Sequence, residues 1–237
     1  MNIFITGANG FIGKHLLNHL IKNTNLNIFI LLRKNKKNSH LDKVFYSKRI
    51  NITYGNFDEL KKVKKIISKC SLICNLGFPN KLKFKSDIKK KKYLISLKNI
   101  LSILKGKKKF KLVHISSSEV YGFNKITDRI CFSENFKTLP QNSYAKAKLE
   151  AENLILNSNN KIIKNTIILR LFNVYGLGQT HKTLINTIIK KLLINKKKIK
   201  LKNIYDQRDY IFLSDVIDAI KCSLLNKNDY GIFNVST

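Results

Sequence analysis

The sequence opens with MNIFITGANGFIG (residues 1–13), a short apolar run followed by three glycines. Asn2–Thr6 has the length and apolar content of a buried strand, and the segment after the glycines has the periodicity of an amphipathic helix. Gly7, Gly10 and Gly13 permit a tight turn, a close approach of a pyrophosphate to the backbone, and tight packing of helix on strand. The N-terminus of the helix adds amide donors for phosphate oxygens. This stretch therefore predicts a dinucleotide-binding turn.

Six further apolar runs of strand length follow, and stretches with helical periodicity lie between them. The alternation of strand and helix predicts a parallel sheet that helices cover on both faces. We therefore expect an α/β fold, a Rossmann-type doubly wound parallel sheet. The seven predicted strands are Asn2–Thr6, Asn27–Leu32, Ile50–Tyr54, Leu72–Leu76, Lys111–Ser116, Thr166–Leu171 and Ile232–Val235.

The composition is strongly basic. The 237 residues include 46 Lys+Arg against 14 Asp+Glu, which gives a formal net charge of +32. A field of this size attracts polyanions, so nucleic acid has to be considered as a partner. However, the lysines are spread along the whole chain and only five of the basic residues are Arg. We attribute the charge to the drift of an A/T-rich genome toward Lys, Ile and Asn, and we do not expect a nucleic-acid partner.

Targeting and metal signals are weak. No segment reaches the roughly 18 apolar residues that span a bilayer, and the N-terminus has the pattern of a strand and not of a signal peptide. Four cysteines are compatible with reduced thiols in the cytoplasm, where we expect the protein to act. The Cys and His residues lack zinc-site spacing, so we expect no metal.

The catalytic candidates lie after the fifth predicted strand. This strand runs into Ser117, Ser118 and Glu119, and downstream Tyr144 and Lys148 are four residues apart, on one face of a predicted helix. A tyrosine with the usual pKa of about 10 is a poor base at neutral pH. A nearby ammonium and an oxidised nicotinamide both favour the phenolate, so the pair suits hydride-transfer chemistry.

The glycine turn, Ser117 and the Tyr144–Lys148 pair together resemble the extended short-chain dehydrogenase/reductase superfamily, and within it the NAD-dependent epimerase/dehydratase family of nucleotide-sugar enzymes. The resemblance implies that Tyr144 removes a proton from a sugar hydroxyl, that Lys148 holds the ribose and tunes Tyr144, and that Ser117 orients the sugar. It also implies proton transfer by Glu119, as in the dehydratases and decarboxylases of the family. The alternative for Glu119 is an ion pair with a nearby lysine.

The resemblance also assigns the cofactor contacts. A site that prefers NAD has a carboxylate after the second strand, where this chain has Arg33, so we slightly favour NADP over NAD. Asn56 replaces the usual acid beside the adenine, and Gly77 keeps the small residue beside the pyrophosphate. The implied cofactor-binding residues are Gly7, Asn9, Gly10, Phe11, Ile12, Gly13, Arg33, Asn56, Phe57, Leu76, Gly77, Tyr144 and Lys148.

The implied substrate contacts lie at the ends of later segments. Ser117 and Ser118 would face the sugar, and Asn173 is similar to the family residue that contacts the nucleotide-sugar. Arg208 stands where the family grips the diphosphate, a task that suits the planar guanidinium. We expect residues 1–171 to form the NAD(P)-binding domain with the catalytic residues. Residues 172–237 would form a small substrate-binding segment plus the last sheet strand, with the C-terminal remainder of the family domain absent.

The leading prediction is an NAD(P)-dependent nucleotide-sugar epimerase or dehydratase that works by hydride transfer through a keto-sugar intermediate. A nucleotide-sugar 4-ketoreductase or decarboxylase of the same family is one alternative. A non-catalytic NAD(P)- or RNA-binding member of the superfamily is the alternative from another class, and the high net charge favours it. The resemblance further implies a homodimer that pairs through the predicted helices 88–104 and 144–156.

Overall fold

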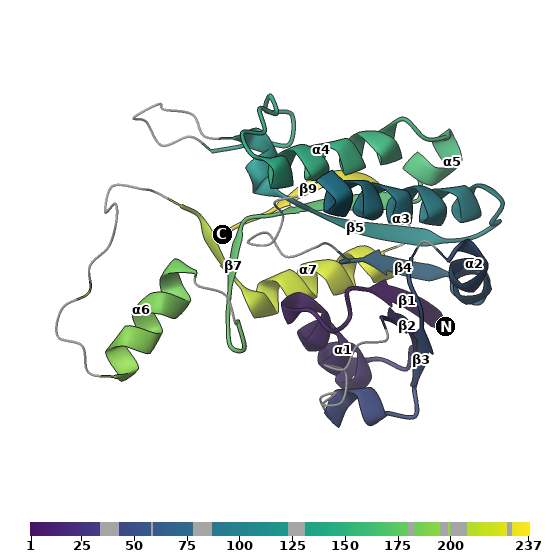
Figure 1. The fold of residues 1–237 in the computed structure, drawn as a ribbon, viewed down its shortest axis with the longest axis horizontal. Helices are drawn as coiled ribbons and strands as arrows, with labels where there is room; N and C mark the ends of the chain where they lie inside the picture. Colours follow the sequence, from purple (N-terminus) through teal and green to yellow (C-terminus); the bar gives the residue numbers. More distant parts are fainter. Residues whose placement is uncertain are drawn as a thin grey trace.

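The computed structural model describes residues 1–33, 43–57, 59–77, 87–122, 131–179, 183–194, 199, 208–226 and 229–237. A seven-stranded sheet forms its centre (Figure 1), with the strands in the order β3-β2-β1-β4-β5-β6-β9 and every neighbouring pair parallel. This sheet confirms the predicted doubly wound α/β fold. The strands are β1 (Asn2–Thr6), β2 (Asn27–Leu32), β3 (Ile50–Tyr54), β4 (Leu72–Asn75), β5 (Lys111–Ser117), β6 (Thr166–Leu171) and β9 (Gly231–Val235).

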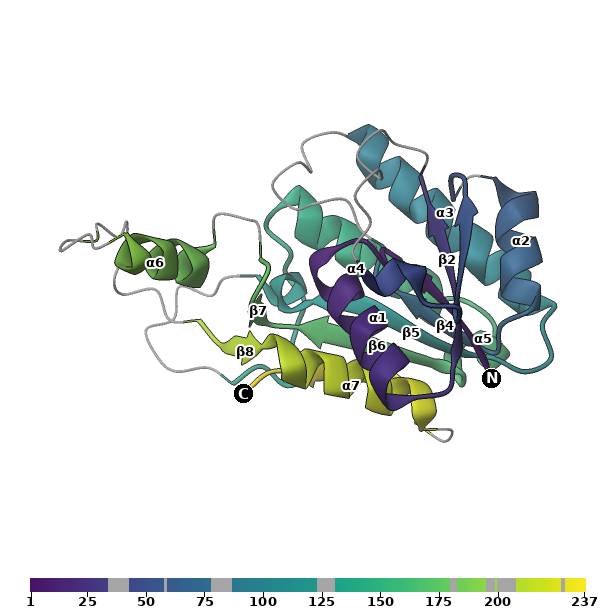
Figure 2. The ribbon, with the colours of Figure 1, turned by 90° about the horizontal axis from the view of Figure 1, so that it is seen from below.

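Helices cover both faces of the sheet, which explains why the strands are apolar without alternation. On one face lie α1 (Phe11–Asn23) and α7 (Leu213–Leu225), side by side in Figure 2. Successive residues of a strand point to opposite faces of the sheet, and each face has its own hydrophobic core. Ile3 and Ile5 belong to the core under α1 and α7, and Phe4 belongs to the core on the opposite face. The helices of the opposite face are α2 (Leu60–Ser68), α3 (Asp87–Lys105), α4 (Ser143–Leu156) and α5 (Asn160–Ile163).

A small part of the chain projects from one side of the sheet (Figure 1). It contains α6 (Leu184–Leu193) and a parallel two-stranded ribbon of β7 (Asn173–Tyr175) and β8 (Tyr210–Phe212). All ten residues of α6 are partly or fully exposed. Two short 3-10 turns complete the described elements, η2 (Lys43–Tyr46) and η4 (Ser118–Tyr121).

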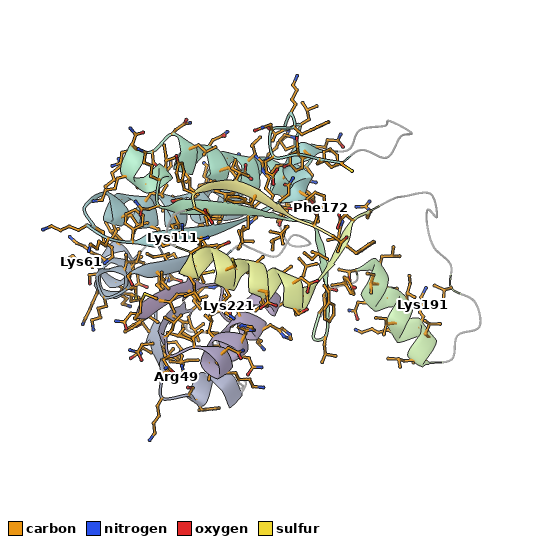
Figure 3. The ribbon with its side chains drawn as sticks, turned by 180° about the vertical axis from the view of Figure 1, so that it is seen from behind. Arg49, Lys61, Lys111, Phe172, Lys191 and Lys221 are labelled. Atoms are coloured by element: carbon orange, nitrogen blue, oxygen red, sulfur yellow. The ribbon has the colours of Figure 1, made fainter. Side chains whose placement is uncertain are left out.

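The lysines are dispersed in space as well as in sequence. Lys61, Lys191 and Lys221 lie on α2, α6 and α7, in separate regions of the molecule (Figure 3). Separately, within the described residues, none of the helices is both long and apolar enough to cross a membrane.

A buried ion pair joins α4 to the sheet. The Arg170 guanidinium on β6 donates to both carboxylate oxygens of Glu152, from Nε to Oε1 at 3.1 Å and from Nη2 to Oε2 at 2.7 Å. The Ser116 hydroxyl donates to the same carboxylate, and Arg170 Nη1 donates to the Tyr121 hydroxyl at 2.9 Å. Both charges are almost completely buried. The pair therefore holds α4, the helix that carries Tyr144 and Lys148, against β6, and the Ser116 hydroxyl connects the same carboxylate to β5, the strand that ends in Ser117.

Breaking this pair should destabilise the fold strongly. Glu152→Gln leaves the buried Arg170 charge without its counter-ion, and we expect a loss of about 3 kcal/mol in the free energy of unfolding. The matched control is Glu150→Gln on the same helix, because Glu150 pairs with Lys90 at the surface and such pairs contribute well under about 1 kcal/mol. Urea denaturation measures both. Equal losses for the two variants would show that the buried pair does not hold α4.

Candidate active site

The glycine turn lies at the carboxyl end of β1, between β1 and α1. Gly7 has a φ of +69°, and a Cβ atom there would lie 2.9 Å from the Cα of Gly77. A Cβ at Gly13 would lie 2.3 Å from the Gly7 carbonyl oxygen, so close packing requires a glycine at both positions. Gly10 is the N-cap of α1, without a side-chain cap, and it is exposed together with Asn9. Phe11 and Ile12 begin the helix and pack partly against the core.

This turn occupies the switch point of the sheet. The strands β2 and β4 lie on opposite sides of β1. Open parallel sheets bind ligands at such a point, in the crevice outside the carboxyl ends of the strands, so we expect the cofactor crevice here. Leu76 and Gly77 follow β4 directly and lie beside Gly7. The structure therefore brings the predicted pyrophosphate-contacting residues of β1, α1 and β4 together.

The predicted adenosine contacts lie farther along the same edge. Leu32 at the end of β2 pairs with Tyr54 at the end of β3, and its carbonyl accepts from the Gly55 amide at 2.9 Å. Arg33 follows Leu32, Asn56 follows Gly55, and both side chains are exposed. Phe57 is partly buried, and its carbonyl accepts from the Asn99 side chain at 3.0 Å. Arg33 and Asn56 are therefore neighbours at the outer end of the crevice.

The predicted catalytic serine and tyrosine meet where β5 ends and α4 begins. The Ser117 side chain accepts from the Glu119 amide at 3.3 Å and so starts η4. Asn142 caps α4 by accepting from the Ala145 amide at 2.9 Å, and its side-chain nitrogen donates to Glu119 Oε2 at 3.0 Å. This link places the first turn of α4 beside η4, where Ser117 and Tyr144 share a side-chain hydrogen bond.

Lys148 lies one turn farther along α4. Its Nζ donates to the Ile115 carbonyl oxygen at 2.7 Å and is 5.9 Å from the centroid of the Tyr144 ring. The ring of Tyr93, from α3, lies 5.5 Å from the same nitrogen. Lys148 is buried, with 3% of its surface exposed. Ser117, Tyr144 and Lys148 are therefore brought together as the sequence predicts.

The electrostatic prediction for Tyr144 needs a correction. The sequence led us to expect that the neighbouring ammonium and an oxidised nicotinamide together lower the pKa of the phenol. In the protein alone, burial raises the pKa of Tyr144 well above its ordinary value, the Glu119 carboxylate raises it further, and the Ser117 hydrogen bond lowers it less than the others raise it. Burial also lowers the pKa of Lys148 to about 7, although Glu152 opposes this shift. Desolvation outweighs the attraction between the pair, because Lys148 is buried and Tyr144 is partly buried beside it.

The predicted substrate residues lie on two parts of the chain: Asn173 is in β7 and Arg208 comes two residues before β8, whereas Ser117 and Ser118 lie at the end of β5 and in η4. Ser117 pairs with Leu171 on the neighbouring strand, so the chain reaches Asn173 two residues beyond the level of Ser117. The Asn173 side chain and amide both donate to the Asp209 carbonyl, at 2.8 and 3.2 Å. Arg208, the neighbour of Asp209, is exposed. Ser118 is half-buried in η4, next to Ser117.

Two residues near Lys148 were missed by the sequence analysis. Tyr93 and His114 are buried polar side chains, and the Tyr93 hydroxyl lies 3.3 Å from His114 Nε2. The available signal was the position of His114 in an otherwise apolar strand, three residues before Ser117. The sequence contains no such signal for Tyr93, because an aromatic residue on the inner face of a helix is typical of ordinary core packing.

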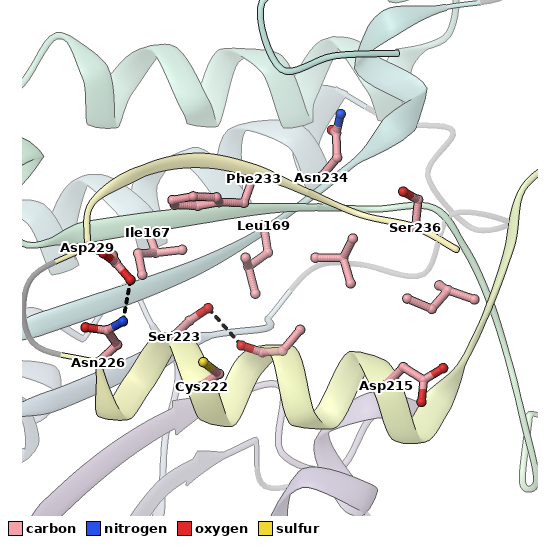
Figure 4. Close-up of a pocket in the computed structure, with 13 residues that line it drawn as sticks. Ile167, Leu169, Asp215, Cys222, Ser223, Asn226, Asp229, Phe233, Asn234 and Ser236 are labelled. Atoms are coloured by element: carbon pink, nitrogen blue, oxygen red, sulfur yellow. Dashed lines mark hydrogen bonds between the residues drawn. The ribbon is translucent and has the colours of Figure 1, made fainter. Parts of the chain in front are cut away.

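An open pocket with a volume of about 400 Å³ lies elsewhere, between α7 and β9 (Figure 4). Its lining includes Cys222 and Ser223 from α7 and Phe233 from β9, and it includes none of the predicted catalytic residues. Among the described residues, no group of three Cys, His, Asp or Glu side chains has the arrangement of a metal site.

Comparison with known proteins places these motifs in a family. The model of the NAD dependent epimerase/dehydratase family matches residues 3–236. A dTDP-D-glucose 4,6-dehydratase of Dictyostelium discoideum is 29% identical over 252 residues, which cover 99% of this chain and 58% of that protein. An ADP-L-glycero-D-manno-heptose-6-epimerase of Brachyspira hyodysenteriae is also 29% identical, over 99% of this chain and 76% of its own length. The chain thus spans less than two thirds of the Dictyostelium protein.

Solved structures have the same fold. The dTDP-glucose 4,6-dehydratase of Bacillus anthracis in complex with NAD matches with a TM-score of 0.85 at 22% identity, over 100% of this chain and 75% of that one. A UDP-glucuronic acid 4-epimerase of Bacillus cereus, in complex with UDP-glucuronic acid and NAD, matches with a TM-score of 0.84 at 24% identity, over 100% and 77%. At these identities the match concerns the fold. The glycine turn at the switch point, the Ser117, Tyr144 and Lys148 cluster and the family match over residues 3–236 lead to one conclusion: this chain belongs to the NAD-dependent epimerase/dehydratase family.

Proposed function

We propose that this protein oxidises a hydroxyl of a nucleotide-activated sugar to a ketone and then epimerises or dehydrates the keto-sugar. The observation that carries the proposal is the Tyr144 phenol, hydrogen-bonded to Ser117 and one helical turn from the buried Lys148, at the same sheet edge as the glycine turn. The names of the relatives support a nucleotide-sugar substrate, because they include a dTDP-glucose dehydratase and a UDP-glucuronic acid epimerase.

In this mechanism each residue has a separate task. Bound NAD or NADP supplies the hydride acceptor. The Ser117 hydroxyl orients the sugar hydroxyl, and the Tyr144 phenolate takes its proton. Lys148 stabilises the phenolate by its charge. Asn173 and Arg208 would bind the nucleotide diphosphate, and residues 172–237 would thus supply the substrate side of the site.

The glycine turn has the close strand-to-helix packing of a dinucleotide-binding turn, because a side chain at Gly7 or Gly13 would collide with the protein's own backbone. Arg33 at the end of β2 favours a 2′-phosphate and therefore NADP, whereas the relatives of solved structure named above are complexes with NAD. We propose NAD or NADP as the cofactor, with a slight preference for NADP. We also propose a homodimer through α3 and α4, which lie side by side on one face of the sheet.

Tyr144→Phe tests the proposed function directly. We expect the rate of cofactor reduction by the true nucleotide-sugar to fall at least about 100-fold, because the proton acceptor is lost, while the affinity for the cofactor stays near normal. Reduced-nicotinamide fluorescence measures both quantities against a panel of nucleotide-sugars, with NAD and with NADP. Tyr46→Phe is the control, since Tyr46 is 74% exposed.

Full turnover by Tyr144→Phe would refute the catalytic assignment. A protein without sugar chemistry gives a different result: RNA binding that falls steeply with salt and is unchanged by Tyr144→Phe. That outcome would support the non-catalytic alternative.

Glu119→Gln separates two parts of the proposed chemistry. The Glu119 carboxylate raises the pKa of Tyr144, so its neutralisation should move the acid limb of the pH–rate profile for cofactor reduction to lower pH. If Glu119 also transfers a proton in a dehydration, product formation should fall about 100-fold while cofactor reduction continues. An unchanged profile, equal to that of Glu150→Gln, contradicts the electrostatic link to Tyr144.

The buried Lys148 charge should make stability depend on pH. The pKa of Lys148 is about 7 in the folded protein and about 10.4 in an unfolded chain. Between these values the unfolded state binds more protons, so this residue makes the folded state gain stability as pH rises from 7 toward 10. Below pH 7 the cost of the buried charge is fully present.

We therefore expect Lys148→Met to be most stable relative to wild type at or below pH 7. Its advantage should shrink by up to about 1.4 kcal/mol per pH unit above that. Urea denaturation of both proteins at pH 6, 7, 8 and 9, values that span about two units above the folded pKa, measures the difference. A difference that does not change with pH would contradict the burial of a charge at Lys148.

A further inference from the structure

Four buried polar side chains form a row beside the catalytic cluster. Thr6, Asn75 and His114 are register partners on β1, β4 and β5, so they lie side by side near the carboxyl ends of three neighbouring strands. Tyr93 from α3 lies over the last of them. At most 5% of the surface of each of these four residues is exposed. Polar groups this deep in a core are costly unless hydrogen bonds satisfy them.

The hydrogen bonds in this row have one direction. The Gly77 amide donates to Thr6 Oγ1 at 2.8 Å, and this hydroxyl donates to Asn75 Oδ1 at 2.7 Å. The Asn75 amide is thereby oriented with Nδ2 toward His114 Nδ1, 3.0 Å away. Since Nδ1 accepts, the imidazole proton is on Nε2, which points to the Tyr93 hydroxyl at 3.3 Å. Aligned hydrogen bonds of this kind strengthen one another.

The row ends at the proposed catalytic lysine. The Tyr93 ring forms one side of the Lys148 pocket, with its centroid 5.5 Å from Nζ. The carbonyl that accepts from Nζ belongs to Ile115, the residue after His114. The position of Lys148 therefore depends on β5 and on the Tyr93 ring, and His114 contacts the hydroxyl of that ring.

His114 acts here as a neutral dipole. Burial lowers the pKa of His114 to about 3, and the charge of Lys148 lowers it further. The titratable groups around Lys148 are Tyr93 from α3, His114 from β5, and Tyr144 and Glu152 from its own helix. Of these, His114 is the one whose hydrogen bonds connect the cluster to the glycine turn.

We propose that His114 is a positioning residue: through the Tyr93 hydroxyl it fixes the ammonium of Lys148 against Tyr144, and through Asn75 and Thr6 it ties that ammonium to the dinucleotide turn. The inference rests on the proposed function, in which Lys148 is the catalytic partner of Tyr144. It predicts that His114 and Tyr93 act on Lys148 as one unit.

A double-mutant cycle on the titration of Lys148 tests this proposal. Protein labelled with ¹³C at lysine Cε is titrated by NMR, and Lys148 is identified as the signal that disappears in Lys148→Met. In His114→Phe the Tyr93 ring loses its anchor and water reaches Nζ, so the titration midpoint should rise by about one pH unit. Tyr93→Phe should give the same rise, and the double variant should add nothing to it.

Two further variants separate positioning from general damage to the core. His114→Gln keeps an acceptor and a donor, and it should restore the midpoint to within about 0.3 unit of wild type. Val113→Ala removes a comparable buried contact on the opposite face of β5, and it should leave the midpoint unchanged. Tyr93→Phe loses one oxygen only, which keeps the test readable if His114→Phe does not fold.

Additive shifts, or a midpoint that neither variant moves, would overturn the positioning role. The NMR readout does not require turnover, so it is independent of the sugar chemistry. If wild type reduces no cofactor with any nucleotide-sugar, the proposed function fails while the cycle still decides the role of His114. Where turnover is found, His114→Phe should lower kcat about 10-fold at unchanged KM for the sugar, and His114→Gln should recover it.

Discussion

The burial of one ammonium group between β5, α3 and α4 shapes the rest of this site. The Lys148 ammonium donates to the Ile115 carbonyl oxygen and lies beside the rings of Tyr93 and Tyr144. Desolvation lowers its pKa toward neutrality, while the same exclusion of water raises the pKa of Tyr144. The protein alone thus holds Tyr144, the proposed base, in its protonated form. In the proposed function, the chemistry of the pair then depends on the charge of a bound dinucleotide at the glycine turn, which lies at the same sheet edge.

The surrounding framework keeps that arrangement rigid. The Glu152–Arg170 pair holds α4 on the sheet, and Asn142 connects the start of α4 to η4. The row from Gly77 to Tyr93 adds a third connection, from the dinucleotide turn to the lysine. Each connection joins two elements that meet at the carboxyl ends of the strands, where open parallel sheets bind their ligands.

Much of this was accessible from the sequence, for physical reasons that can be traced to particular residues. The central strands β4, β5 and β6 are buried along their whole length, so their apolar runs were continuous, and the limits of all seven strands were predicted to within one residue. The importance of Gly7 and Gly13 could be recognised in the sequence, because the close packing of backbone on backbone at these positions excludes any side chain. The proximity of Tyr144 and Lys148 could be predicted, because a helix places residues four apart on one face.

The features that could not be predicted from the sequence depend on contacts between distant segments of the chain. The pKa of Tyr144 was expected to fall, and in the protein alone it rises, because burial is a property of the assembled site. The partnership of Asn75 with His114 follows from strand register, which no local pattern encodes. The three-residue strands β7 and β8 are too short to produce a period, so the ribbon that carries Asn173 and joins Asp209 was not predicted.

We propose that Tyr144 and Lys148 support hydride removal from a nucleotide-sugar. The most direct test is a rapid-mixing measurement of reduced-nicotinamide absorbance, with a sugar that carries deuterium at the carbon to be oxidised. We expect a transient of reduced cofactor that forms more slowly with the deuterated sugar than with the ordinary one. A product that forms without any such transient, or a transient that deuterium leaves unchanged, would contradict it.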